Sequence, residues 1–283
     1  MRLTGKVAVV TGSTRGIGEG IAVRLAREGA RVVVAGRSRS DGHRVERVIR
    51  DAGGDATYVQ TDVAIESEAQ HLVDTAVERF GALHVLVNNA ALTDSNPETA
   101  DRPLTELPTE VFKRIFDVDF MSVVYCCKRA IPAMQSAGGG SIINISSTTS
   151  LLAIEGMPAY VAAKGAMNAL TRQLAVDYGP LVRVNAIIVG SVDAGNAVSR
   201  RKRADPAIRA AHQRMHATRL GEREDVAAAA AFLASEDDAG FITGTQLVVD
   251  GGVTMKMALP SIASLHEPLA QDDVPFRAAS DSE

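Results

Sequence analysis

Tyr160 and Lys164 stand four residues apart in the sequence, and Ser147 lies thirteen residues before Tyr160. On a helix, residues i and i+4 share one face with Cβ atoms about 5–6 Å apart, so the Lys164 ammonium can lie beside the Tyr160 hydroxyl. A cation beside a tyrosine favours its phenolate form. Together with a serine hydroxyl, this pair can give or take a proton at an alcohol or a ketone. The spacing alone also fits an amphipathic helix with a half-buried tyrosine and a lysine that reaches water.

The composition is that of a globular protein. The chain has 283 residues, 46% of them hydrophobic and 23% charged, which is enough material for one or two domains. The formal net charge of -4 argues against a general nucleic-acid-binding surface, so we expect a small-molecule partner. The two cysteines, Cys126 and Cys127, are adjacent and would form a strained disulfide, which fits a reducing cytoplasm. No signal peptide and no apolar run of about 18 residues is apparent, so we expect a cytoplasmic protein with no membrane association.

Short β-branched runs alternate with helix-length periodic segments along the chain, which indicates βαβ units. Because these runs are apolar throughout, we expect a parallel sheet with helices on both faces. We predict one α/β domain over residues 1–253 and a C-terminal extension over 254–283, loosely ordered or packed on a neighbouring subunit. The predicted strands cover residues 6–11, 30–35, 56–61, 83–88, 141–146, 182–188 and 246–250.

A glycine turn follows the first predicted strand and leads into a helix near residues 19–28. Gly12, Gly16 and Gly18 allow the backbone to approach a pyrophosphate closely, and the helix N-terminus offers N–H groups to an anion. The spacing departs from G-x-G-x-x-G, and a glycine turn between strand and helix is often only a turn. Its place after the first strand favours a dinucleotide site, since such ligands bind at the carboxyl ends of the strands.

Taken together, these motifs resemble the short-chain dehydrogenase/reductase family from about Gly5 to Gly252. The resemblance is specific and long, and within the family the chain resembles the β-ketoacyl carrier-protein reductase-like branch. It implies a Rossmann-like, doubly wound sheet of seven parallel strands in the order 3-2-1-4-5-6-7, and a homotetramer or homodimer. The matching residues are Thr11, Gly12, Gly16, Ile17 and Gly18, then Asn88, Asn89 and Ala90, then Ser147, Tyr160 and Lys164, and finally Val248, Val249, Asp250, Gly251 and Gly252.

The resemblance implies hydride transfer between a nicotinamide cofactor and a carbonyl carbon. Ser147 would bond the substrate oxygen, Tyr160 would act as general acid/base, and Lys164 would assist Tyr160 and hold the nicotinamide ribose. Ser146 is a rival for the serine role, but neighbours on a strand face opposite ways, and we expect Ser146 to bond backbone. The implied cofactor-binding residues are Gly12, Ser13, Thr14, Arg15, Gly16, Ile17, Gly18, Arg37, Asp62, Val63, Asn89, Ala90, Tyr160, Lys164, Gly190 and Val192.

Cofactor choice should be set at the end of the second strand, where NAD enzymes carry an acidic residue for the ribose 2′-OH. This chain has Gly36, Arg37 and Ser38 there. With no carboxylate to repel a 2′-phosphate, Arg37 and Arg15 could hold it, so we favour NADP(H), with NAD(H) as the alternative. For Asp62, the alternative to a place beside the adenine is a helix cap.

Four positions depart from the family pattern: Asp119 replaces an asparagine, Ala91 a glycine, Val189 a proline and Ala194 a threonine. The asparagine supports a water-linked proton path to the lysine. An ionised carboxylate can only accept hydrogen bonds, so Asp119 either retunes this path or pairs with Lys164. We therefore count Asp119 among the candidate catalytic residues. Because these departures weaken the grip on the cofactor, the alternative function is a cofactor-binding protein that senses or assembles without turnover.

The lid region, about residues 190–219, is basic. Its cations could attract an anionic acyl carrier protein or coenzyme A thioester, but a solvated helix surface is the better interpretation. His212 and His216 have i, i+4 spacing, yet Gln213 replaces the glutamate of H-E-x-x-H and no third ligand is evident, so we predict no metal. The basic residues of this segment are Arg200, Arg201, Lys202, Arg203, Arg209, Arg214 and Arg219, and the acidic Asp205 lies among them.

Overall fold

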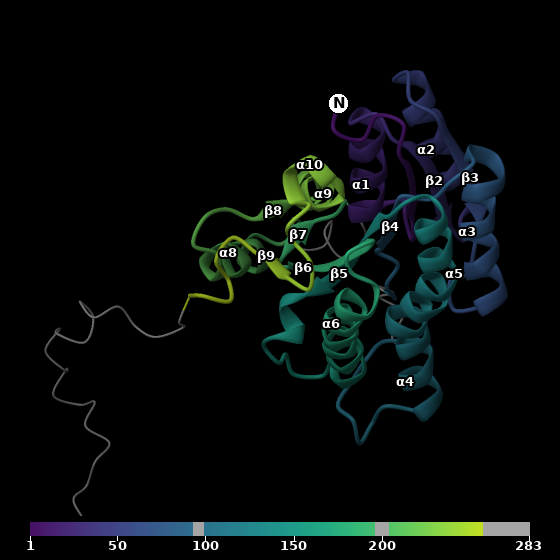
Figure 1. Cartoon of the computed structure of the whole chain (residues 1–283). Coiled ribbons are helices and arrows are strands. Elements are labelled where there is room, and N and C mark those ends of the chain that lie inside the picture. The colour runs from purple at the N-terminus through teal and green to yellow at the C-terminus, as the bar shows by residue number, and fades with distance from the viewer. Residues whose placement is uncertain (93–98, 196–203, 257–283) are drawn as a thin grey trace, which may run out of the picture.

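A computed structural model describes residues 1–92, 99–195 and 204–256, and a seven-stranded parallel sheet runs through it. The strand order is β3-β2-β1-β4-β5-β6-β9. Because β9 is the seventh strand of this sheet along the chain, the predicted order 3-2-1-4-5-6-7 and the Rossmann-like fold are confirmed (Figure 1). The strands are β1 (Val7–Val10), β2 (Arg31–Gly36), β3 (Ala56–Gln60), β4 (Val85–Asn88), β5 (Gly140–Ser147), β6 (Val182–Val189) and β9 (Gln246–Val249).

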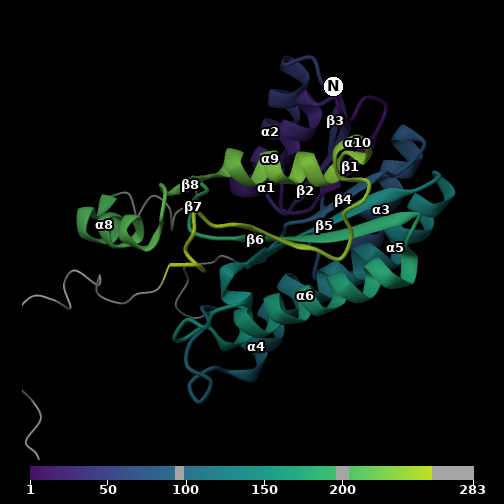
Figure 2. The ribbon, with the colours of Figure 1, turned by 60° about the vertical axis from the view of Figure 1, so that its left-hand side comes forward.

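Helices cover both faces of the sheet, as the uniformly apolar strands require. Successive residues of β1 point to opposite faces. Ala8 and Val10 belong to the core under α1 (Gly16–Arg27), α2 (Arg39–Asp51) and α9 (Arg223–Ala234). Val7 and Val9 belong to the core under α3 (Glu66–Phe80), α5 (Ser122–Ser136) and α6 (Pro158–Tyr178). Figure 2 shows the two helical layers on either side of the strands.

The segments between these elements contain shorter pieces of regular structure. A π-helical turn (Asp117–Met121) joins α4 (Thr109–Phe116) to α5, and a 3₁₀ turn (Thr148–Ser150) follows β5 directly. A further helix, α10 (Glu236–Ala239), precedes β9. The pair β7 (Val192–Asp193) and β8 (Gly221–Glu222) was not predicted from the sequence, because two-residue strands carry no periodic signal.

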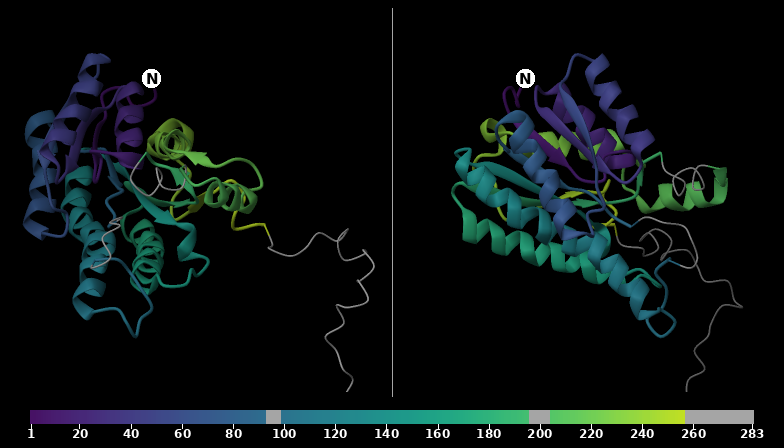
Figure 3. Two further views of the ribbon diagram at one scale, coloured as in Figure 1. Left: turned by 180° about the vertical axis from the view of Figure 1, so that it is seen from behind. Right: turned by 90° about the vertical axis from the view of Figure 1, so that its right-hand side faces the viewer.

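The lid is described only in part. Helix α8 (Pro206–Met215) begins after Asp205, whose carboxylate accepts hydrogen bonds from the N–H groups of Ala207 and Ile208. It lies beyond the two helical layers (Figure 3), next to β7 and β8 (Figure 2). The basic residues 200–203, and the predicted C-terminal extension from residue 257 onward, lie outside the described residues.

Both cysteines are free and buried in α5, in agreement with the absence of a disulfide framework from the sequence. Burial raises the pKa of both thiols, that of Cys127 to about 12. Of the helices in the described ranges, none is long and apolar enough to cross a membrane.

Candidate active site

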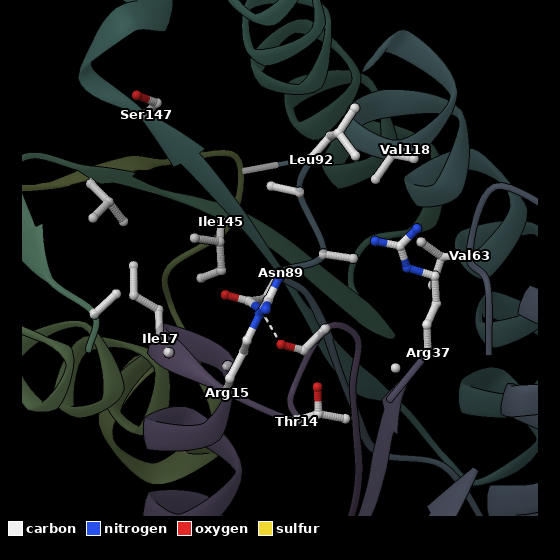
Figure 4. A pocket seen from close by; sticks show the side chains of 18 of the residues that line it. Thr14, Arg15, Ile17, Arg37, Val63, Asn89, Leu92, Val118, Ile145 and Ser147 are labelled. Atoms are coloured by element: carbon white, nitrogen blue, oxygen red, sulfur yellow. Dashed lines mark hydrogen bonds between the residues drawn. The ribbon is translucent and has the colours of Figure 1, made fainter. Parts of the chain in front are cut away.

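A cavity of about 600 Å³ opens at the carboxyl ends of the strands, beside the point where β1 has β2 on one side and β4 on the other. Ligands of doubly wound folds bind at this switch point. Figure 4 shows Arg37, which follows β2, and Ser147, which ends β5, on opposite sides of the view. The predicted residues that line the cavity are Gly12, Thr14, Arg15, Gly16, Ile17, Gly18, Arg37, Asp62, Val63, Asn89, Ala90, Ser147, Tyr160, Lys164 and Gly190.

Three predicted residues lie elsewhere. The Ser13 hydroxyl donates to the Val10 carbonyl at 2.6 Å and accepts from the Ala35 N–H at 2.9 Å, so it ties the glycine turn to β1 and β2. Val192 lies in β7, and the residues that line the cavity there are Val189, Gly190 and Ala194. Asp119 is behind the cavity wall and fully buried.

The glycine turn packs directly against the end of β4. Gly12 has a φ of +61°, and a Cβ on it would lie 2.8 Å from the Ala90 Cα. A Cβ on Gly18 would lie 2.4 Å from the Asn89 Nδ2 atom. Side chains at these two positions would therefore displace the turn, and their absence leaves a cradle open to the cavity.

Thr11 and Asn89 hold this turn in place. The Asn89 side chain donates to the carbonyls of Thr11 and Gly12 at 2.9 and 3.1 Å, and the N–H groups of Asn89 and Ala90 donate to the Thr11 hydroxyl. Helix α1 starts here without a side-chain cap on its first N–H groups. A bare glycine cradle at an uncapped helix N-terminus fits the pyrophosphate of a dinucleotide.

The end of β2 has no room for an acidic side chain, because a Cβ on Gly36 would lie 2.7 Å from the Thr14 Cγ2 atom. Arg37 lines the cavity, and Figure 4 shows its guanidinium beside Val63. Ser38 caps α2 by accepting from the Asp41 N–H at 3.4 Å. Asp41 also lines the cavity, so this end of the site carries both signs of charge.

The helix-cap alternative for Asp62 is wrong, because the N-cap residue of α3 is Ile65 and no side-chain bond caps that helix. Asp62 lines the cavity, and its Oδ1 atom accepts from the Ala64 N–H at 3.1 Å in the turn before α3. Its Oδ2 atom pairs with the Arg114 guanidinium at 3.0 Å. Burial alone would raise the pKa of Asp62, but the bonds from Arg114 and Ala64 and the charges of Arg114 and Arg37 hold it below its ordinary value.

Tyr160 and Lys164 share one face of α6, as their spacing predicts. Tyr160 is the third residue of the helix, and the Lys164 Nζ atom lies 5.5 Å from the centre of its ring. Lys164 is only 2% exposed and donates to the Ile145 carbonyl at 3.2 Å. The lysine does not reach water here, so the surface-helix alternative is wrong for Lys164.

Asp119 faces Lys164 from the π-helical turn. Its Oδ1 atom is 3.3 Å from the Lys164 Nζ atom, and its Oδ2 atom accepts from the Leu92 N–H at 2.9 Å. The contact with Lys164 is an ion pair without a well-aligned hydrogen bond, since Oδ1 has no hydrogen-bond partner among the described atoms. The pairing of Asp119 with Lys164, one of two outcomes expected from the sequence, is confirmed.

The two serines at the end of β5 differ in their bonds. Ser146 donates to the Lys164 carbonyl at 3.5 Å, which is the backbone bond that the sequence predicts for it. The Ser147 Oγ atom accepts from both the N–H and the hydroxyl of Thr149. Both serines border the cavity.

Sequence reasoning missed several residues of the site. Asp101 accepts the Tyr160 N–H on its Oδ2 atom at 2.9 Å, and Thr149 contacts Ser147. Neither belongs to a periodic segment, so no sequence signal identifies them. Further residues on the cavity wall include Gly36, Ser38, Asp41, Thr61, Leu92, Val118 and Ile145.

The two lid histidines bond to nearby groups. His212 Nδ1 lies 3.0 Å from the Ser191 hydroxyl, and His216 Nδ1 donates to the His212 carbonyl at 2.6 Å. Within the described ranges, no group of three or more metal-binding side chains comes together. Arg219, one of the predicted basic residues, pairs with Asp225 at 2.7 Å.

Similar proteins cover nearly the whole chain. Residues 12–254 match a family model described as Enoyl-(Acyl carrier protein) reductase. The 3beta-hydroxysteroid dehydrogenase 1 of Eggerthella lenta is 40% identical over 257 residues, or 89% of this chain and 95% of the relative. The cis-4-hydroxycyclohexanecarboxylate dehydrogenase of Sinomonas cyclohexanicum is 40% identical over 254 residues, or 88% of this chain and 96% of the relative. A solved structure from Sinorhizobium meliloti, assigned as a short-chain alcohol dehydrogenase, has a TM-score of 0.83 at 30% identity and covers 90% of this chain and 98% of its own.

Proposed function

This chain belongs to the short-chain dehydrogenase/reductase family, and from that premise we propose that it interconverts a ketone and a secondary alcohol with Tyr160 as general acid/base. It is an oxidoreductase acting on CH–OH groups and uses a nicotinamide cofactor. The observation that carries the proposed chemistry is the buried Lys164 ammonium 5.5 Å from the Tyr160 ring, on the wall of a cavity that also contains Ser147.

Each of these residues has a defined role in the proposed reaction. When bound, the nicotinamide supplies or accepts the hydride. Tyr160 gives a proton to the carbonyl oxygen in reduction and takes the alcohol proton in oxidation, while Ser147 donates a hydrogen bond to the same oxygen. Lys164 stabilises the phenolate form of Tyr160 and holds the ribose. The glycine turn between Gly12 and Gly18 binds the pyrophosphate.

We propose a secondary alcohol on an aliphatic ring as the substrate class. Three similar proteins are named for ring compounds of this kind: the Eggerthella and Sinomonas dehydrogenases described above and the cyclohexanol dehydrogenase of Acinetobacter, which is 35% identical over 257 residues. Apolar residues on the cavity wall support this proposal, because they can bury a hydrocarbon ring. These residues are Leu92, Val118, Ile145 and Val189.

We propose NADP(H) as the preferred cofactor. Gly36 leaves no carboxylate to repel a 2′-phosphate, and the Arg37 guanidinium lines the cavity beside it. Replacement Arg37→Ala should raise the KM for NADPH about tenfold and change the KM for NADH less than about twofold. Arg39→Ala removes a neighbouring charge that bonds Gln60 and should leave both values unchanged. Equal effects of Arg37→Ala on both cofactors would contradict the preference.

The reaction is tested by following NADPH absorbance with the purified full-length chain and a panel of cyclic ketones. Tyr160→Phe should lower the rate by at least about a hundredfold, because the proton donor is lost. Tyr178→Phe, at the other end of α6, is the matched control and should retain activity. If the wild type binds NADPH yet reduces no carbonyl compound, the alternative of a sensing or assembly protein without turnover is favoured.

From the family resemblance we also propose a cytoplasmic homotetramer or homodimer, with residues 1–253 as one domain. The mass in solution, measured by light scattering, tests the assembly.

A further inference from the structure

Ser147 accepts two hydrogen bonds from one neighbour. The Thr149 N–H lies 3.2 Å from the Ser147 Oγ atom, and the Thr149 hydroxyl donates to the same atom at 3.0 Å. A serine hydroxyl has one hydrogen to donate and two lone pairs that accept. Both lone pairs of Ser147 are therefore in use. Its hydrogen has no acceptor among the hydrogen bonds of the described residues.

The turn that carries Thr149 is fixed to the helix that carries Tyr160. Ser150 donates from its hydroxyl to the Ser147 carbonyl at 2.5 Å. Asn168, on α6 one turn beyond Lys164, donates to the Ser150 hydroxyl at 2.7 Å. Ser147 and Thr149 are 8% and 6% exposed, so water has little access to compete for these bonds. The donor arrangement around Ser147 is thus built into the fold.

We propose that Thr149 is a positioning residue that makes Ser147 a donor only, aimed at the substrate oxygen. This proposal rests on the proposed function and extends it. A ketone oxygen can only accept, so it receives hydrogen bonds from both Ser147 and Tyr160. An alcohol must place its own hydrogen on an acceptor. Because the lone pairs of Ser147 are taken, that hydrogen goes to Tyr160, the residue that removes it.

The test compares two substitutions at one buried position. Thr149→Val keeps the shape and the N–H but removes the hydroxyl, whereas Thr149→Ser keeps the hydroxyl. With cyclohexanone and NADPH, Thr149→Val should lower kcat about tenfold and leave the KM for NADPH within about twofold. Thr149→Ser should stay within about twofold of the wild type. In a Ser147→Ala background, Thr149→Val should have no further effect, because it acts through Ser147.

A binding measurement separates this proposal from the proposed reaction. Calorimetric titration of cyclohexanone into the NADP⁺ complex involves no turnover. The Kd should rise about fivefold in Thr149→Val, remain unchanged in Thr149→Ser, and be the same in Ser147→Ala with or without the valine. This pattern in a protein that lacks turnover would support the role of Thr149 and contradict the proposed reaction. Full activity and binding in Thr149→Val, an equal loss in the Ser147→Ala background, or no binding to the wild type would overturn the role of Thr149.

Discussion

Asp119 gives the buried lysine of the site a counter-charge of its own. A buried ammonium without a partner is strongly unfavourable, and Lys164 otherwise bonds only the Ile145 carbonyl among the hydrogen bonds described for it. An asparagine at this position would still accept the Leu92 N–H on its oxygen. Its NH₂ group, which is a donor, would then face the Lys164 ammonium, which is also a donor. The carboxylate therefore suits the direct contact with Lys164 better than the asparagine of the family pattern does.

We predict that Asp119→Asn slows alcohol oxidation. A buried ammonium without a counter-charge is strongly unfavourable, so removing the carboxylate weakens the hold on Lys164 beside Tyr160. Initial rates with cyclohexanol and NADP⁺ should fall about fivefold to tenfold. Asp117→Asn removes a carboxylate from the same π-helical turn without an ion pair to Lys164, so a similar loss of rate there would contradict the role of Asp119.

At the level of single residues, sequence reasoning succeeded where spacing encodes geometry. The i, i+4 rule places Lys164 beside Tyr160, and the end of a strand places Ser147 at the sheet edge. It failed for Thr149 and Asp101, because their partners depend on the path of a loop and not on a period. The prediction for Asp119 was partly successful. Its charge indicated a pairing with Lys164, but the sequence has no pattern that predicts its position on a π-helical turn.

Among the elements, α6 depends on a residue from outside the helix for its N-terminal cap. Its own N-cap residue, Met157, has no side-chain oxygen, and no side-chain bond caps the helix locally. The Asp101 carboxylate accepts the Tyr160 N–H instead and complements the helix dipole. The first turn of the helix that carries Tyr160 is thus held by a segment 59 residues away in the sequence.

We predict that Asp101→Ala lowers kcat about fivefold to tenfold. Loss of the cap reduces the stability of the first turn of α6 by about 1 kcal/mol, and Tyr160 moves when that turn frays. The KM for NADPH should change less than about twofold, since the glycine turn is untouched. Asp101→Asn keeps an acceptor oxygen and should recover most of the rate. A loss of thermal stability in Asp101→Ala with an unchanged kcat would show that the cap supports the fold but does not position Tyr160.

The regular elements were predictable because burial on both faces leaves long apolar runs. The predicted strand at residues 6–11 is observed as Val7–Val10, and the one at 246–250 as Gln246–Val249. Strand ends shift by a residue or two, because the run of apolar residues does not mark where pairing stops. The two-residue pair β7 and β8 is set by how the lid returns to the sheet, for which the sequence has no local pattern.

At the scale of the whole molecule, Glu19 connects three helices that cover one face of the sheet. It lies on α1 and accepts from both terminal nitrogens of Arg44 on α2, at 3.0 and 2.7 Å. Arg223 on α9 approaches the same carboxylate at 3.3 Å. Arg44 also donates to the Thr14 carbonyl, which joins this cluster to the glycine turn of the cavity. The three charged residues are far apart in the sequence, so their cluster forms only in the folded chain.

This cluster predicts how stability depends on pH. Burial alone would raise the pKa of Glu19, but the hydrogen bonds and charges of Arg44 and then Arg223 hold it below its ordinary value of 4.5. A carboxyl group with a lowered pKa stabilises the fold fully above the pKa of the unfolded chain. Its contribution is lost as the pH falls through the lower folded value. Glu19→Gln should therefore reduce the free energy of unfolding by about 1–2 kcal/mol at pH 7 and by less toward pH 3.

Urea unfolding of the wild type and the variant at steps from pH 7 to pH 3 measures this difference. Glu28→Gln is the matched control, because Glu28, the residue at the C-terminal end of α1, pairs with Arg24 of that helix and has no ion pair to a second helix within the described residues. A single i,i+4 ion pair at the end of one helix contributes little, so the control should change the free energy of unfolding by less than about 0.5 kcal/mol. If Glu19→Gln reduces the free energy of unfolding by the same amount at every pH, the variant has lost packing and hydrogen bonds that do not depend on the charge. The charge of Glu19 would then not be what holds α1, α2 and α9 together.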